Sequence, residues 1–239
     1  NITVRPKGQR ARGCALQGRF MQSVIFDLDG TLLDSMALWH SAGDVYLKEL
    51  GIDAADGIAE KIFTLTVRGA AEYIKESYGL ALSVDEVVRG INGVMERAYF
   101  QTIQPKEGAA GLIRALSARG VKMAIATATD KYLVRAALSR LGLESYFSGI
   151  FTCSEVGVSK RDGADVYEAA QRCLGAERED CWVFEDSPHA ARSAAAAGFK
   201  VAGVKDVGGG SDQKELKKNC KAYFESFVPV ENVLKTIGI

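Results

Sequence analysis

Residues 24–35 read Val-Ile-Phe-Asp-Leu-Asp-Gly-Thr-Leu-Leu-Asp-Ser, a short apolar run that ends in Asp27 and Asp29. Alternate residues of an extended segment point to the same side, so these two carboxylates face one crevice at the end of a buried strand. Their repulsion is unfavourable unless a cation or a proton lies between them. A divalent hard metal fits best, because the ligands are oxygens and neither His nor Cys lies nearby. The alternative is a plain Asp-rich turn, in which Gly30 permits the sharp bend and Thr31 bonds the loop backbone.

Further short apolar runs follow along the chain, each preceded by helical periodicity. They occupy 123–127, 150–153, 182–185 and 201–204. The segment 130–141 shows the helical pattern best, with apolar residues on one face and Gly142 as a stop. Strands that are apolar throughout, separated by amphipathic helices, indicate a parallel sheet covered on both faces. We therefore predict an α/β fold with a doubly wound, Rossmann-like parallel sheet.

Almost ninety residues without a convincing strand separate the first two runs. Helical faces appear at 37–50, 68–78 and 83–100, the last with the capping box Ser83-Val84-Asp85-Glu86, and 108–119 reads as the helix before the second strand. An insertion this long exceeds a simple crossover, so we expect a helical cap over the C-terminal ends of the strands. The predicted domains are an α/β core at 21–35 and 106–239, an all-helical cap at 36–105, and a basic, flexible extension at 1–20.

Composition excludes several classes of protein. The apolar share of 47% and the charged share of 25% in 239 residues are those of an ordinary globular protein. Thirty basic residues balance thirty acidic ones, which argues against a nucleic-acid partner. No apolar stretch reaches the length of a membrane span, so we expect no membrane partner. The first twenty residues lack an apolar h-region, so a secretory signal is not expected, and a transit peptide is the weaker alternative because they contain no Ser.

The cysteine and histidine content limits the kinds of metal site and catalytic mechanism to expect. Five cysteines, widely spread and without a Cys-x-x-Cys pair, favour reduced thiols and a cytoplasmic location over disulfides or a zinc site. His40 and His189 are the only imidazoles, and neither has a partner suggested by spacing. We read both as surface or packing residues, which argues against a Ser-His-Asp or His-ligated mechanism.

Residues suited to phosphate chemistry stand at or near the predicted strand ends. They are Asp27 and Asp29; Thr127, Thr129 and Asp130; Lys160; and Glu185, Asp186 and Ser187. Strand ends of an open parallel sheet converge on one crevice, so these distant residues can form a single site. That site would combine carboxylates, hydroxyls and one cation.

Two segments that contain these residues resemble motifs of the haloacid-dehalogenase-like (HAD) hydrolase superfamily. Asp-Leu-Asp-Gly-Thr-Leu-Leu-Asp-Ser at 27–35 is similar to its first motif, and Phe-Glu-Asp-Ser followed by Ala-Ala-Arg-Ser-Ala-Ala-Ala-Ala-Gly within 184–198 is similar to its fourth. The resemblance covers about 22–228. It is closest to the helical-cap subfamily that includes phosphoglycolate phosphatase and β-phosphoglucomutase.

The resemblance implies a role for each core residue. Asp27 would attack phosphorus to give an aspartyl-phosphate, and Asp29 would serve as general acid and then general base. Thr127 would hydrogen-bond a phosphoryl oxygen, and Lys160 would neutralise charge. Mg²⁺ would be held by Asp27, Asp186 and the backbone carbonyl of Asp29, with Glu185 acting through water.

The third motif is the least regular. The family pattern is Gly-Lys-Pro-x-Pro-Asp, but here 159–165 read Ser-Lys-Arg-Asp-Gly-Ala-Asp, without prolines and with one extra residue. Counting back from Asp165 selects Arg161, and counting forward from 155–157 selects Lys160. We prefer Lys160, because a compact ammonium can reach both phosphate and carboxylate.

Candidate substrate-binding residues lie mostly in the cap. Arg68 matches a cap arginine that binds a second anionic group in relatives, although an exposed arginine at a helix start is the plain alternative. Ser35 and Trp39 are four apart on the first cap helix, so one face could bring both over the pocket. Thr129 is a further candidate beside the second motif. β-Phosphoglucomutase-like members have a histidine where Trp39 falls, which counts against a mutase.

We therefore expect a Mg²⁺-dependent phosphatase acting on a small phosphorylated metabolite, as a monomer or weak homodimer. A phosphomutase is the first alternative. A dehalogenase is less expected, because a halide leaving group needs no general acid and Asp29 would then have no role. Phosphonate cleavage through an imine needs a lysine in the cap. Lys61 and Lys75 lie in the cap but in no matching motif. A catalytically silent binding or regulatory module is the alternative from another class; the disabled members one expects would have lost Asp27, Asp29 or Asp186.

Overall fold

The computed structural model describes residues 22–63, 65–206, 208 and 212–239. The predicted extension at 1–20 lies outside these residues. Within them, no helix is both long enough and apolar enough to cross a bilayer.

Six parallel strands form one sheet in the order β3-β2-β1-β4-β5-β6. Their bounds are β1 Ser23–Phe26, β2 Lys122–Thr127, β3 Ile150–Thr152, β4 Cys181–Glu185, β5 Lys200–Val204 and β6 Ala222–Phe224. The doubly wound parallel sheet is confirmed, and its first five strands match the predicted apolar runs to within a residue or two. β6 was not predicted, because three residues at the sheet edge leave too short an apolar pattern to detect.

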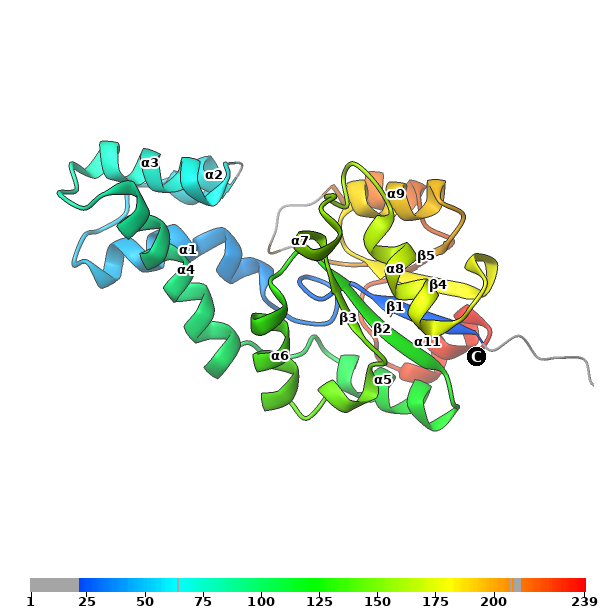
Figure 1. Ribbon diagram of the computed structural model, residues 1–239. Helices are drawn as coiled ribbons and strands as arrows, with labels where there is room; N and C mark the ends of the chain where they lie inside the picture. The colour runs from blue at the N-terminus through cyan, green and yellow to red at the C-terminus, as the bar shows by residue number, and fades with distance from the viewer. Residues whose placement is uncertain (1–21, 64, 207, 209–211) are drawn as a thin grey trace, which may run out of the picture.

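Helices cover both faces of the sheet (Figure 1). One face packs against α5 Ala109–Ala118, α6 Lys131–Arg140 and α11 Val230–Ile237. The other packs against α8 Asp165–Leu174, α9 Pro188–Ala196 and α10 Gln213–Lys218. Short elements complete the core: α7 Cys153–Val156, η1 Glu144–Tyr146 and η2 Arg178–Asp180. The chain buries side chains from both faces of β1, because Ile25 joins one cluster while Val24 and Phe26 join the other.

Four further helices, which we call the cap helices, lie between β1 and α5. They are α1 Met36–Glu49, α2 Ile58–Phe63, α3 Val67–Tyr78 and α4 Val84–Gln101, and in Figure 1 they extend away from the sheet. The predicted capping box is confirmed, because Ser83 and Glu86 exchange the expected hydrogen bonds at the start of α4. α2 was not predicted, since six residues carry less than two helical turns of pattern. The proposed domain bounds of 36–105 for the cap and 21–35 with 106–239 for the core stay a prediction.

The two chain segments that join cap helices and sheet run side by side. The Asp34 backbone N–H donates to the Gln104 carbonyl at 2.9 Å, and the Lys106 N–H donates to the Leu32 carbonyl at 2.8 Å. Leu33 also forms an isolated bridge with Pro105. The loop after β1 is therefore tied to the segment that returns from α4.

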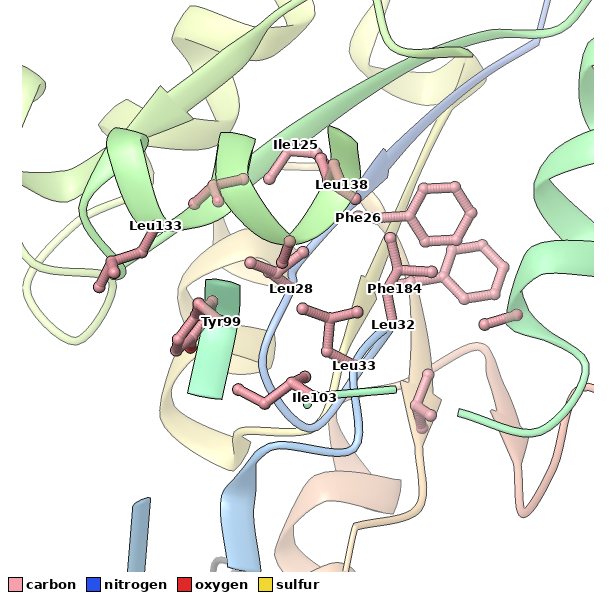
Figure 2. Packing of buried hydrophobic residues seen from close by; sticks show 14 of the residues in the cluster. Phe26, Leu28, Leu32, Leu33, Tyr99, Ile103, Ile125, Leu133, Leu138 and Phe184 are labelled. Atoms are coloured by element: carbon pink, nitrogen blue, oxygen red, sulfur yellow. The ribbon is translucent and has the colours of Figure 1, made fainter. Parts of the chain in front are cut away.

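Apolar side chains pack beneath this junction (Figure 2). The labelled cluster combines residues of the β1 loop with residues of α4, the segment after α4, α6 and the sheet, namely Phe26, Leu28, Leu32, Leu33, Tyr99, Ile103, Ile125, Leu133, Leu138 and Phe184. All are buried. Because exclusion of this apolar area from water stabilises the junction, the loop that carries Asp29 sits on a packed base.

Candidate active site

Three adjacent strands bring the predicted residues to one edge of the sheet. β1 lies between β2 and β4, with Phe26 in register with Ile125 on one side and with Phe184 on the other. Asp27 follows β1 directly, and its backbone N–H donates to the Phe184 carbonyl at 3.0 Å. Thr127 ends β2 and Glu185 ends β4, so the switch in strand order places all of these groups at a common crevice.

Three carboxylates form a buried cluster at this edge. Oxygen atoms of Asp27, Glu185 and Asp186 lie within 4.8 Å of one another. The Lys160 ammonium donates to Asp27 Oδ1 and, at 2.6 Å, to Glu185 Oε1. The structure thus brings Lys160 rather than Arg161 onto the first-motif aspartate. Arg161 lines the cavity nearby, and its carbonyl accepts from Ser193 Oγ at 3.4 Å.

Burial and crowding control the charge of this cluster. Burial raises the pKa of Asp27 to about 7 against the opposing effect of Lys160, and Glu185 and Asp29 add repulsion. Burial, together with repulsion from Asp27 and Glu185, also raises the pKa of Asp186 well above its usual range. Burial lowers the pKa of Lys160, but attraction to Asp27 and Glu185 outweighs it and holds that pKa above its ordinary value. Lys160 alone therefore does not compensate for the burial and crowding of these carboxylates, and without a further cation Asp27 and Asp186 hold protons more readily than free carboxylates do.

The cluster fits a divalent hard cation. All three side chains offer oxygen ligands, and within the described part of the chain Asp186 forms no ion pair, receiving only a 3.4 Å hydrogen bond from Thr31 Oγ1. A cation among these oxygens would relieve the repulsion that burial makes costly. Asp27 and Asp186 are the residues that would hold it, with Glu185 beside them.

Gly30 allows this close approach. Its φ of 78° lies in the left-handed region, and a Cβ there would lie 2.4 Å from Asp186 Oδ2. A side chain at this position would collide with the carboxylate of the fourth motif, so the turn after β1 needs a glycine for space as well as for backbone conformation.

Asp29 is held by three hydroxyl donors from separate parts of the chain. Oδ1 accepts from Ser35 Oγ at 2.5 Å and from the Tyr99 phenol, and Oδ2 accepts from Thr129 Oγ1 at 2.7 Å. Trp39 Nε1 in turn donates to the Tyr99 hydroxyl at 3.0 Å. The carboxylate is therefore oriented by both cap helices and sheet loops.

Sequence reasoning assigned some of these residues differently. Ser35 was expected over the pocket with Trp39, but it is fully buried, does not line the cavity and instead contacts Asp29. Its position at the N-cap of α1 explains this, because the side chain points back toward the β1 loop. Tyr99 was missed altogether, since it lies seventy residues from Asp29 on the apolar stripe of α4 and reads there as packing.

Two further polar contacts support the site and were also missed. The Tyr167 phenol on α8 donates to Glu185 Oε1 at 2.6 Å. Lys106 Nζ donates to the Gly30 carbonyl at 2.6 Å and to Asp206 Oδ1 at 2.9 Å. No motif marks these residues, because each acts through a contact between segments distant in sequence.

A cavity of about 790 Å³ opens between the cluster and the cap helices. Thr127 and Thr129 line it from the β2 loop, where Thr127 Oγ1 accepts from the Thr129 N–H at 3.1 Å. Trp39 and Arg68 line it from the cap side. Arg68 is already paired with Asp85 at 2.9 Å and with Glu72 at 3.6 Å, and its side chain is 63% exposed.

The histidines take the places expected of surface or packing residues. His40 packs on Phe63, with ring centroids 4.9 Å apart. His189 is exposed at the rim of the cavity, where its Nδ1 lies 2.7 Å from an Arg192 nitrogen.

The family model of haloacid dehalogenase-like hydrolases matches residues 21–198, which include the whole carboxylate cluster and the lysine. The chain belongs to this family. The resemblance seen in its first and fourth motifs is thereby confirmed, as is the expectation of a hydrolase.

Several curated relatives of this haloacid dehalogenase-like hydrolase carry phosphatase names. It is 25% identical over 180 residues to a "Phosphorylated carbohydrates phosphatase" of Thermotoga maritima, covering 75% of this chain and 83% of the relative. It is 30% identical over 190 residues to a "Probable pseudouridine-5'-phosphatase" of Drosophila melanogaster, covering 76% and 80%. A solved structure of a HAD family hydrolase from Deinococcus radiodurans R1, with bound phosphate and sodium, matches at a TM-score of 0.71 and 25% identity, covering 92% of this chain and 97% of that one.

Proposed function

We propose that this hydrolase is a Mg²⁺-dependent phosphatase that cleaves a small phosphate monoester through an aspartyl-phosphate. The observation that carries the proposal is the position of Asp27, which lies in the carboxylate cluster, contacts Lys160 and lines the cavity. The phosphatase names of the relatives, and the phosphate bound in the Deinococcus structure, support it.

In the first step, a carboxylate oxygen of Asp27 attacks phosphorus and the bond between phosphorus and the ester oxygen breaks. Asp29 gives its proton to the departing alkoxide. Lys160 stabilises charge on Asp27 and on the transferring group, and the Thr127 hydroxyl donates to a phosphoryl oxygen. Mg²⁺, held by Asp27, Asp186 and the Asp29 carbonyl with Glu185 near it, would supply charge neutralisation for the phosphoryl group.

In the second step, water attacks the phosphorus of the aspartyl-phosphate. Asp29, now a carboxylate, takes a proton from this water, and the bond between Asp27 and phosphorus breaks to release inorganic phosphate. The hydroxyls of Ser35, Tyr99 and Thr129 orient the Asp29 carboxylate for both proton transfers.

The proposed binding partner is a small phosphorylated metabolite, with no nucleic acid or membrane partner. We propose that the enzyme acts as a monomer or weak homodimer. The reduced-thiol pattern supports a cytoplasmic location. In the described residues the four cysteines at 153, 173, 181 and 220 are free thiols.

Phosphate release from p-nitrophenyl phosphate tests the proposal. We expect release with Mg²⁺, loss of release with excess EDTA, and recovery when Mg²⁺ is restored. Asp27→Asn removes the nucleophile and should reduce kcat by at least about 1,000-fold. Release that is independent of Mg²⁺ and unchanged in Asp27→Asn would reject the mechanism, and isomer formation from sugar phosphates without free phosphate would indicate a mutase.

A further inference from the structure

The cavity has two chemically different walls. The wall at the strand ends is formed by the charged cluster around Asp27. The wall on the cap side is largely apolar and is formed by Trp39, Phe63, Val67, Val88 and Met95. A phosphate ester bound with phosphorus at Asp27 would therefore place the rest of the molecule against apolar side chains.

Exposed apolar side chains border the cavity on both sides. Val67 of the cap wall is 37% exposed, and Tyr132, which lines the cavity from α6 opposite, is 51% exposed. A smaller hollow of about 130 Å³ between the cap helices shares Trp39, Phe63 and Val67 with the main cavity. Large apolar side chains that are exposed at a concave surface indicate a binding site more often than a role in folding.

Polar groups on the cap wall are few. Among the described residues that line the cavity from the cap helices, Arg68 and Asn92 carry polar side-chain groups besides the Trp39 indole. The indole N–H already donates to Tyr99, and Arg68 already pairs with Asp85. A polyhydroxylated chain would lose its hydrogen bonds with water here and regain few of them, which disfavours its binding.

The shape of the wall suits a ring. Trp39 and Phe63 place two aromatic side chains on the wall, and aromatic side chains bind other rings in stacked or edge-to-face arrangements. A volume of about 790 Å³ lies in the upper part of the range of roughly 300–1,000 Å³ found for small-molecule sites. The cavity thus has room for more than a phosphate with a short carbon chain.

We infer that the substrate is a phosphate monoester whose distal part is a flat aromatic ring system, as in a nucleoside monophosphate or a flavin mononucleotide, and not a bare sugar phosphate. The inference rests on the proposed phosphatase function and specifies its substrate class. The apolar cap wall binds the ring, and the cluster around Asp27 binds the phosphate.

Ribose 5-phosphate and nucleoside 5′-monophosphates form a matched set, because they share the sugar and the phosphate and differ by the base. We expect kcat/KM for adenosine or uridine 5′-monophosphate, or for flavin mononucleotide, to exceed that for ribose 5-phosphate at least about tenfold, equivalent to 1.4 kcal/mol. Equal or faster hydrolysis of ribose 5-phosphate than of every ring-bearing ester would overturn the inference while leaving the phosphatase in place. Absence of phosphate release from all of these esters and from p-nitrophenyl phosphate would reject both.

Variants of the cap wall test the same point from the protein side. Phe63→Ala should lower kcat/KM for the best ring-bearing ester about tenfold, mainly through KM, and change that for ribose 5-phosphate less than about twofold. Phe100→Ala is the matched control, because Phe100 is 48% exposed on α4 and does not line the cavity. Val88→Thr keeps the side-chain shape, adds a hydroxyl to the wall and should act in the same direction if Phe63→Ala does not fold. Equal losses for both kinds of substrate would contradict a ring-binding wall.

Discussion

The Tyr99 phenol on α4 donates a hydrogen bond to Asp29 Oδ1 in the loop after β1. Burial, and then the neighbouring Asp29 carboxylate, raise the pKa of Tyr99 above its usual range, so the phenol stays protonated and acts as a donor. The contact joins a cap helix to the proposed general acid. Catalysis should therefore depend on a side chain that belongs to none of the four family motifs.

Tyr99→Phe removes this donor and keeps the ring. We expect kcat to fall about tenfold for an alkyl phosphate and less than about threefold for p-nitrophenyl phosphate, whose leaving group needs little protonation. Steady-state kinetics with both esters measure the difference. Tyr78→Phe is the control, because its hydroxyl contacts the Ala55 N–H on the cap; equal losses for both esters in Tyr99→Phe would show that the phenol has only a structural role.

Lys160 and Arg161 provide a direct test of the third-motif cation. Lys160→Met leaves Asp27 and Glu185 without their ammonium partner, so kcat should fall at least about 100-fold. Arg161→Met should retain kcat within about fivefold, because within the described residues Arg161 lines the cavity but its side chain makes no hydrogen bond or ion pair with the carboxylate cluster. Single-turnover and steady-state measurements decide between them, and the reverse order of losses would assign the role to Arg161.

Alanine substitutions at two glycines in the middle of α4 should have opposite effects on stability. A Cβ on Gly90 would lie 2.0 Å from the Tyr46 ring, whereas one on Gly93 would lie 3.3 Å from the flexible end of Arg97. Gly93→Ala should therefore raise the free energy of unfolding by about 0.5–1 kcal/mol through helix propensity. Gly90→Ala should lower it by about 1–3 kcal/mol through overpacking. Urea unfolding of both variants checks the signs, and stabilisation by Gly90→Ala would contradict the packing of α1 on α4.

Thiol reactivity should follow burial. Burial raises the pKa of Cys181 to about 12, so about one molecule in ten thousand carries its thiolate at pH 8. Burial also raises the pKa of Cys220 to about 11. In a timed reaction with iodoacetamide followed by peptide mapping, exposed Cys173 should be labelled well before Cys181. Because the pKa of Cys181 is raised, the rate of Cys181 labelling should increase as the pH rises. If Cys181 were labelled as fast as Cys173 at pH 8, β4 would not be buried as described.

Much of the fold and the centre of the site were readable from local pattern. Apolar runs marked β1 to β5, because strands of a parallel sheet are buried on both faces and carry few polar residues. Asp27, Glu185 and Asp186 were readable because carboxylates directly after such runs must lie at a strand end. β6 and α2 were not predicted, because segments of three and six residues are too short to show a clear periodicity. Packing against the rest of the chain stabilises them.

The amino-acid sequence by itself determined the strand-end carboxylates and the order of β1 to β5 along the chain, since both depend on neighbours a few residues apart. Only the tertiary structure decided that Lys160 contacts Asp27, that Tyr99 and Ser35 orient Asp29, and that apolar cap residues face the cluster. These contacts link segments up to 133 residues apart. Their geometry follows from how cap helices and sheet pack together, which no local spacing along the chain records.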